Sequence, residues 1–252
     1  MKNEKLLAGL LILTSVSLFS CKKEDSFSST YTMSFPATLV QNDGKYTAYV
    51  DKEGIIYLTE ESVQNANQES YPLSETKRAT LLVSYDYQDY VYEDKTPIVK
   101  KAELITYAPI PTSKVYVAEP TSEEDKKVVE DALNPDSIHQ INSVYDEYAY
   151  LGYFNLDFTA MCNNSVEPKV TLLCDSVKNN EMYVRLLFNN HSVSDPKKEL
   201  NRYFYSFEMS SIQVPGYDSI TVNLGVYNNN TKPVYSQKKI GRGDVSGIIE
   251  RL

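Results

Sequence analysis

The chain has 252 residues with 25 basic and 34 acidic side chains, which gives a formal net charge of −9. A surface this acidic repels phosphate groups, so nucleic acid is excluded as a partner. The length allows one large or two modest domains, each able to bury a core. With 21 tyrosines, no tryptophan and frequent valine, isoleucine and threonine, the composition favours strands over helices.

The first residues predict a signal peptide. Lys2 and Lys5 precede an apolar run over residues 6–19, and charged residues follow Cys21 at once. A positive end, an apolar middle and a small residue before the cleavage site are typical of an export signal. The apolar run is shorter than the about 20 residues that a membrane-spanning helix needs. We therefore expect residues 1–21 to be a lipoprotein signal segment that directs export.

Residues 18–21, Leu-Phe-Ser-Cys, resemble the bacterial lipobox. The resemblance implies that the Cys21 thiol is acylated, and several acyl chains together give stable membrane anchoring. The expected location is the cell envelope, at the outer membrane. Residues 22–25, Lys-Lys-Glu-Asp, resemble the acidic signal that sends some Bacteroidetes lipoproteins to the cell surface, and a solvated leader is the alternative. Residues 22–30 are then a flexible tether.

Alternating residues after the tether predict a first, strand-rich domain. Tyr31, Met33 and Phe35 share one face of a segment with period two, as in a half-buried strand. Turn signals follow at residues 42–44 and 51–54, and a polar segment over residues 60–73 predicts a loop with one helical turn. The expected strands are residues 31–35, 45–50, 55–59, 78–87 and 99–107. Five strands in about eighty residues are typical of a small Greek-key β-barrel, which we place at residues 31–119.

Prolines then mark a junction between two domains. Pro109, Pro111 and Pro120 interrupt the strand pattern. Hydroxyl side chains at residues 121–122 and acids at residues 123–125 predict the start of a helix, which the Asn-Pro pair at residues 134–135 ends. We expect residues 120–136 to form a linker with one short helix.

The second half, residues 137–252, predicts an antiparallel β-sandwich. Short alternating segments are separated by clusters of Asn, Asp, Gly or Pro, at a spacing that is typical of sandwiches. The expected strands are residues 138–145, 149–162, 170–177, 181–189, 202–212, 219–227 and 233–240. The predicted fold class is therefore all-β, with one short helix between the two domains.

Two cysteines remain besides Cys21. Cys162 and Cys174 lie on one face of an expected hairpin whose turn is residues 163–169. An exported chain meets an oxidising compartment, so the pair forms either a disulfide or two buried free thiols. A disulfide across so short a loop would stabilise the fold by about 3 kcal/mol.

The sequence contains no catalytic constellation, so we predict a protein that is not an enzyme and needs no cofactor or metal. His139 and His191 have no nucleophile at a recognised spacing and are interpreted as surface or turn residues. Four acidic residues gather in one segment, at Asp86, Asp89, Glu93 and Asp94. They could bind Ca²⁺ or cleave a glycoside, but their spacing matches no calcium loop and favours a solvated loop.

Tyrosines in the same segment are the candidate ligand contacts. They are Tyr85, Tyr87, Tyr90 and Tyr92, in an excursion between two strands of the expected barrel. Aromatic rims of β-domains bind sugars or protein partners. Cross-strand packing of the tyrosines is the alternative, and the pattern favours it.

Three segments resemble a known family. Residues 45–54 (KYTAYVDKEG), 78–85 (RATLLVSY) and 136–138 (DSI) look like parts of the NigD-like lipoproteins of Bacteroidetes. The resemblance implies an N-terminal OB-like barrel and a C-terminal β-sandwich behind a lipobox. The chain departs from it at Val144 and Tyr145, where relatives often have a tryptophan. The family's association with a bacteriocin locus implies an immunity-like role and supplies no catalytic residues.

These observations predict a lipid-anchored envelope protein that binds a protein or peptide partner, such as a toxin. The alternative is a glycan-binding surface lipoprotein, because a barrel of this type is a credible platform for sugars. The missing tryptophan, the strongest stacking platform, counts against sugar.

Overall fold

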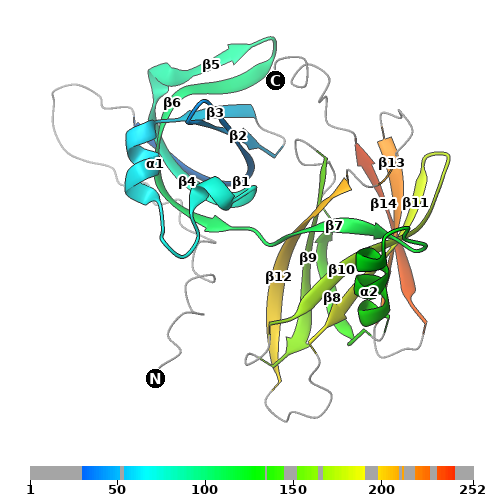
Figure 1. Cartoon of the computed structure of the whole chain (residues 1–252). Helices are drawn as coiled ribbons and strands as arrows, with labels where there is room; N and C mark the ends of the chain where they lie inside the picture. The colour runs from blue at the N-terminus through cyan, green and yellow to red at the C-terminus, as the bar shows by residue number, and fades with distance from the viewer. Residues whose placement is uncertain are drawn as a thin grey trace, which may run out of the picture.

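The computed structural model describes residues 30–51, 54–133, 135–144, 152–163, 167–190, 198–209, 212, 219–227 and 232–241. The predicted signal segment, the lipidation site Cys21 and most of the tether lie outside these residues, as does His191. The described residues form two β-sheets, two short α-helices and two 3₁₀ turns (Figure 1). Neither α-helix of this part of the chain is long and apolar enough to cross a membrane.

The first sheet has six strands, five of which (β1–β4 and β6) close into a ring. Their order is β3-β2-β1-β4-β6-β5, and a parallel pairing between β3 and β6 closes the ring. The strands are β1 (Thr30–Asn42), β2 (Lys45–Val50), β3 (Gly54–Leu58), β4 (Arg78–Asp86), β5 (Tyr90–Glu93) and β6 (Thr96–Pro109). All five strands predicted in this region are confirmed, and β5 is an additional one. Helix α1 (Glu60–Ala66) and the 3₁₀ turn η1 (Leu73–Glu75) lie between β3 and β4, and η2 (Tyr87–Asp89) precedes β5.

Alternation along the strands builds the core of the ring. Phe35 on β1 lies opposite Leu81 on β4, and both side chains are buried. Val63 of α1 packs into the same cluster. The long strand β1 pairs first with β4 and then with β2, so it bends the sheet towards closure.

The second sheet has eight strands in the order β14-β13-β11-β10-β7-β12-β9-β8 and is curled into a half-barrel. It comprises β7 (Thr112–Val117), β8 (Ile138–Val144), β9 (Tyr153–Cys162), β10 (Lys169–Lys178), β11 (Glu181–Asn189), β12 (Glu199–Glu208), β13 (Ser219–Val226) and β14 (Val234–Gly241). Three of its pairings are parallel: β7 with β10, β7 with β12, and β11 with β13. The prediction of a purely antiparallel sandwich is therefore wrong in strand direction, because it took neighbours in sequence as neighbours in space.

Strand β7 explains much of this difference. Only Ile110 and Pro111 separate it from β6, so one extended segment leaves the ring and enters the middle of the second sheet (Figure 1). These residues fall within the predicted barrel segment 31–119. Their strand partners, β10 and β12, lie in the second half of the chain.

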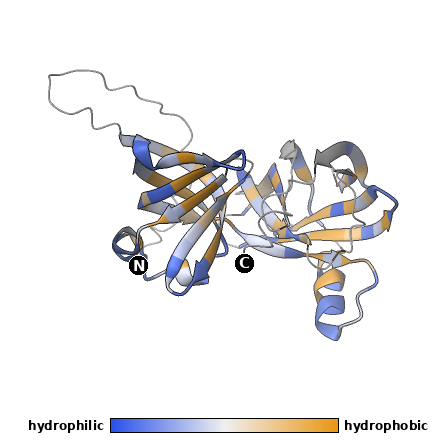
Figure 2. Cartoon of the chain, turned by 90° about the horizontal axis from the view of Figure 1, so that it is seen from above, coloured by the Kyte–Doolittle hydropathy of each residue, from blue (hydrophilic) through white to orange (hydrophobic). Residues whose placement is uncertain are grey.

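The second sheet buries side chains on both of its faces. One face forms the larger core, with alternate residues such as Phe154, Leu156 and Phe158 of β9 fully buried. Helix α2 (Glu123–Ala132), the predicted linker helix, covers part of the other face and packs Val129 against Leu173 and Leu187. Figure 2 shows the apolar residues concentrated along the strands of both sheets.

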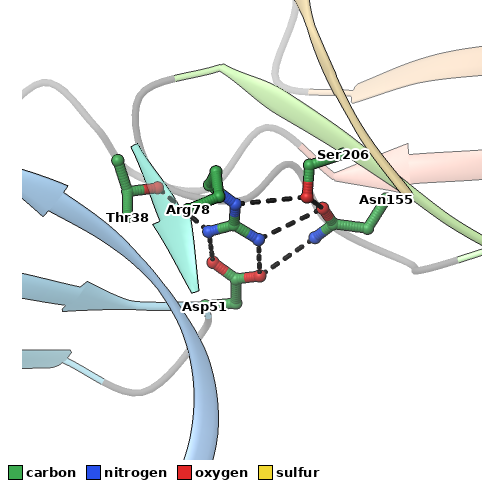
Figure 3. Close-up of polar contacts among 5 residues, drawn as sticks. All are labelled: Thr38, Asp51, Arg78, Asn155 and Ser206. Carbon is green, nitrogen blue, oxygen red and sulfur yellow. Dashed lines mark hydrogen bonds and ion pairs between the residues drawn. The ribbon is translucent and has the colours of Figure 1, made fainter. Parts of the chain in front are cut away.

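The two sheets meet at a buried polar cluster, formed by Thr38, Asp51, Arg78, Asn155 and Ser206 (Figure 3). Arg78 donates to both carboxylate oxygens of Asp51, each at 2.6 Å, and its Nη1 also donates to Thr38 Oγ1 at 2.9 Å. From the second sheet, Ser206 Oγ accepts from Arg78 Nε at 3.2 Å, and Asn155 Oδ1 accepts from Nη2 at 3.2 Å. Asn155 Nδ2 donates in turn to Asp51 at 2.9 Å. The cluster therefore links the ring to the half-barrel.

Backbone contacts support the same junction. The amide of Ile110 donates to the carbonyl of Arg78, and the amide of Ser206 donates to that of Pro111. The ring of Tyr153 lies 5.3 Å from the Arg78 guanidinium carbon, in cation–π contact.

Candidate functional site

Five tyrosines form a continuous aromatic surface on the ring, which we call the tyrosine ladder. Its members are Tyr31, Tyr85, Tyr87, Tyr90 and Tyr92. The structure thus brings together all four tyrosines proposed from the sequence as ligand contacts. Two of them are more exposed than buried, Tyr87 at 63% and Tyr92 at 67% of their surface.

Each ring of the ladder contacts the next along its length. Tyr31 stacks on Tyr85 with 5.9 Å between ring centroids, and Tyr85 stacks on Tyr90 at 6.3 Å. Tyr90 meets Tyr92 edge to face at 5.5 Å, and its hydroxyl donates to that of Tyr92 at 3.1 Å. Tyr87 joins at the other end, 5.9 Å from Tyr31. Such arrangements are the favourable geometries of aromatic pairs.

Strand periodicity places the ladder on the mouth of the ring. Tyr31 and Tyr85 are direct cross-strand partners, two residues beyond the pair formed by Met33 and Val83. Because alternate residues share a face, the side of β1 and β4 that builds the core further along carries tyrosines here. The ladder is therefore the outward continuation of the barrel core.

Below the ladder lies an apolar cavity of about 260 Å³, which we call the barrel pocket. Its lining comes from five strands and consists of Met33, Phe35, Val50, Gly54, Ile55, Ile56, Tyr90, Pro97 and Val99. Tyr90 belongs to both the pocket and the ladder, and Met33 Sδ accepts from the Tyr85 hydroxyl at 3.0 Å. The two features therefore form one site.

Glycine at position 54 is required by the way the pocket closes. Gly54 has φ +131°, and a Cβ there would lie 2.0 Å from the Pro97 carbonyl oxygen. Only glycine lets β3 approach β6 this closely. The ring closure and the pocket wall thus depend on the same residue.

Acidic residues border the ladder. Asp86 and Glu93 are exposed beside Tyr87 and Tyr92, and Asp86 accepts from the Thr30 hydroxyl at 3.1 Å. Glu93 lies 3.7 Å from the Lys100 ammonium in an exposed ion pair. Across the described residues no three His, Cys, Asp or Glu side chains gather in a way that could hold a metal ion.

Burial makes one ladder hydroxyl harder to ionise. It raises the pKa of Tyr85 above its ordinary value, and the neighbouring Tyr31 adds to the rise. At neutral pH the Tyr85 hydroxyl is therefore a hydrogen-bond donor, in keeping with its contact to Met33. Tyr85 therefore offers an aromatic face and a neutral hydroxyl rather than an ionised base.

The two cysteines do not face each other across a hairpin. Cys162 ends β9, whose partners are β8 and β12, and Cys174 lies on β10, whose partners are β7 and β11. Both are buried and free, and Asn190 Nδ2 donates to Cys162 Sγ at 3.2 Å. Burial raises the pKa of the Cys174 thiol to about 11. The expected cross-strand placement of the two cysteines is therefore wrong, because β9 and β10 are not neighbours in the sheet.

The comparison with known proteins gives the fold a name. No family model and no curated protein matches the sequence. Among solved structures, a NigD-like immunity protein from Bacteroides caccae aligns with 85% of this chain and 94% of its own, at 14% identity and a TM-score of 0.50. This chain has the NigD-like fold. The resemblance seen in the sequence is confirmed at that level.

Two further solved structures share this NigD-like fold. A candidate toxin-related protein from Parabacteroides distasonis aligns with 88% of this chain and 100% of its own, at 14% identity and a TM-score of 0.54. A candidate lipoprotein from Bacteroides fragilis aligns with 84% of this chain and 98% of its own, at 12% identity and a TM-score of 0.50. Likeness at such low identity concerns the fold, so the site is argued from the residues of this chain.

Sequence reasoning missed two parts of the site. Tyr31 was read only as a strand residue, and its place in the ladder follows from its register with Tyr85. The pocket was not predicted at all, because its walls come from residues up to 66 positions apart, Met33 and Val99. The run Tyr-x-Met-x-Phe at residues 31–35 was the available signal, since it places all three on one face.

Proposed function

We propose that this protein is a lipid-anchored envelope protein that binds a protein or peptide partner without changing it chemically. The observation that carries the proposal is the exposed tyrosine ladder above an apolar pocket. A few exposed aromatic residues next to a concave apolar site can supply most of the binding energy for a partner. A binding role requires nothing more of these residues than surface and shape.

The anchor is proposed at Cys21, with residues 22–30 as tether and the outer membrane as location. The lipobox-like residues 18–21 support it, and one protein of the same fold is named as a candidate lipoprotein. Beyond the tether we propose an OB-like barrel within residues 31–119, a linker at 120–136 and a second domain at 137–252, which β7 joins from the end of the first segment. Five ring strands closed into a barrel, with α1 after the third strand, support the OB-like assignment.

The partner is proposed to be a toxin of a competing strain, which the protein intercepts at the envelope. The support comes from the NigD-like immunity protein and the toxin-related protein that share the fold. In this role the partner is held by non-covalent contacts alone.

Glycan binding is the second candidate, favoured by the exposure of the ladder rings. Three of the five rings stack on one another, however, so part of their faces is already occupied. A sugar ring stacks best on a free aromatic face, which only the outermost tyrosines provide. We therefore place a protein or peptide partner first.

The anchor is tested by growing cells with labelled palmitate. Wild-type protein is expected to carry the label and to sediment with outer membranes. Cys21→Ala is expected to carry none and to leave the membrane fraction. Label on the Cys21→Ala protein, or its absence from the wild type, would overturn the proposed anchor.

The binding function is tested by killing assays on a deletion strain, challenged with culture supernatants of competing strains. Deletion is expected to sensitise the cells, and the wild-type gene restores resistance. The double variant Tyr87→Ala/Tyr92→Ala is expected to fail in this rescue, whereas Tyr71→Ala, an equally exposed tyrosine outside the ladder, rescues. Unchanged killing across a broad panel, together with saturable binding on a glycan array, would favour the second candidate.

A further inference from the structure

We propose that the partner of the binding function inferred above is a cationic peptide segment that carries one bulky apolar side chain. The apolar side chain enters the barrel pocket, and lysine or arginine side chains lie against the outer rings of the ladder. The proposal rests on the proposed binding function and specifies the chemistry of its partner.

The pocket is sized for a side chain rather than for a whole small molecule. Its volume of about 260 Å³ is below the roughly 300–1,000 Å³ of pockets that enclose drug-sized ligands. Its lining is made almost wholly of aliphatic and aromatic groups, with Met33 as an adaptable wall. An apolar side chain gains free energy from leaving water here, while a hydroxylated sugar would lose hydrogen bonds.

The charges around the ladder determine whether a positively or a negatively charged partner is attracted. Asp86, Asp89, Glu93 and Asp94 lie in or next to the ladder segment, and the whole chain carries a formal net charge of −9. Lys95, Lys100 and Lys101 are nearby cations, and Lys100 pairs with Glu93. The acidic residues outnumber them, so a peptide with positive charges is attracted to this rim and an acidic one is repelled.

Tyrosine rings add a second attraction for cations. An ammonium or guanidinium group over an aromatic face is stabilised by the ring's quadrupole. The same chain already uses this contact elsewhere, since Lys114 Nζ lies 5.0 Å from the Tyr116 ring centroid. The outer rings of Tyr87 and Tyr92 have the exposed surface that such a contact needs.

The test uses a short peptide, acetyl-Gly-Lys-Trp-Lys-Gly-amide, and the purified lipidated protein in detergent. The protein has no tryptophan, so the emission of the peptide's indole reports its own environment without background. Binding is expected to shift this emission to shorter wavelength, and the affinity is expected to fall severalfold as salt is raised. Two control peptides replace both lysines by glutamate or the tryptophan by serine; the serine peptide is followed by competition.

Variants of the protein locate the binding. The pair Tyr87→Ala/Tyr92→Ala and the pair Asp89→Asn/Glu93→Gln are each expected to weaken peptide binding at least tenfold. Tyr71→Ala and the pair Glu124→Gln/Glu130→Gln, exposed residues away from the ladder, serve as matched controls and are expected to bind as wild type. Circular dichroism spectra confirm that each variant is folded.

The outcomes separate this proposal from the broader function. Equal binding of the lysine and glutamate peptides, or an indole that stays in a water-like environment, would overturn the cationic-peptide assignment. So would wild-type affinity in both ladder variants. If the peptides fail while the deletion strain is sensitised and rescued as described above, the proposed function stands and only the partner chemistry is wrong.

Discussion

Strand β4 connects two regions that use their side chains in opposite ways. It begins at Arg78, whose side chain is fully buried in the polar cluster between the sheets. Seven residues later, roughly 23 Å along the strand, Tyr85 lies in the exposed tyrosine ladder. The molecule thus buries its charges at one end of β4 and exposes its aromatic rings at the other.

The two ends of β4 differ in whether their side chains already have partners within the protein. In the polar cluster Arg78, Asp51 and Asn155 satisfy one another; among the described residues, the buried side-chain atom without a partner is Asn223 Nδ2, outside the cluster. A fully satisfied buried network fixes geometry and offers nothing to a ligand. The ladder, in contrast, keeps apolar ring surface in water, which a partner can cover. Stability and binding are therefore expected to respond to different mutations.

The largest expected effect comes from removing the charge at the buried end. Arg78→Met leaves the Asp51 carboxylate, 8% exposed, without its counter-ion. Breaking one side of a buried pair costs about 3–5 kcal/mol, which urea unfolding measures. Lys114→Met removes an exposed pair with Asp125 and is expected to cost far less. Similar losses in the two variants would show that the cluster does not hold the sheets together.

Ring closure is expected to be the next most sensitive point, and it links the two regions through the pocket. Gly54→Ala combines an unfavourable backbone conformation with a 2.0 Å approach to the Pro97 carbonyl. We expect it to lower the unfolding free energy by roughly 2–3 kcal/mol and to abolish entry of the probe peptide's indole. Gly44→Ala is the control, because Gly44 has φ +81° but no neighbour within 4 Å. Its cost is expected to be only about 1 kcal/mol, with peptide binding unchanged. Thermal unfolding of both variants shows whether the loss of stability comes from the contact with Pro97 or from the positive φ angle alone.

The ion pair between Asp157 and Arg202, next to the polar cluster, is expected to make stability depend on pH. Asp157 lies two residues beyond Asn155 on β9, accepts from Arg202 Nε at 2.9 Å and from Asn142 Nδ2 at 2.9 Å. Burial alone would raise the pKa of Asp157, but these bonds and the Arg202 charge lower it below its ordinary value of 3.8. A lowered pKa in the folded state means that this stabilisation is present above pH 3.8 and is lost as the pH falls through the folded pKa.

Asp157→Asn is therefore expected to flatten the loss of stability on the acid side of the urea-unfolding profile. At neutral pH the variant starts less stable, because it lacks the charge that faces Arg202. The measurement is the unfolding midpoint at several values between neutral and pH 3. An unchanged acid slope would mean that another carboxylate dominates there.

The sequence predicted the strands well because period two is a local property. β2 begins and ends at the predicted residues, and all seven strands expected in the second half are present. It did not predict that β7 inserts between β10 and β12, because that parallel placement depends on contacts about 60 to 90 residues away. A strand read from alternation carries no information on its direction relative to distant strands.

The two ends of β4 show the same limit for sites. Four ladder tyrosines were predicted because they are close in sequence, at residues 85–92. Arg78 was not singled out, since its partners Asp51, Asn155 and Ser206 are 27, 77 and 128 residues away. In the sequence, an arginine at the start of a strand gives no sign of whether it will face solvent or a carboxylate.

The smallest expected effects on stability come from single ladder tyrosines. The more buried a ring is, the more its removal is expected to destabilise the fold. Tyr85 is partly buried and stacks on two rings, so Tyr85→Ala is expected to lower the unfolding free energy by about 1–2 kcal/mol. Tyr87→Ala removes a ring that is 63% exposed and is expected to change it by no more than about 0.5 kcal/mol. Peptide affinity is expected to fall in both. Were Tyr87→Ala to destabilise the fold as much as Tyr85→Ala, the outer ring would be a packing residue, and the surface available to a partner would shrink to Tyr92.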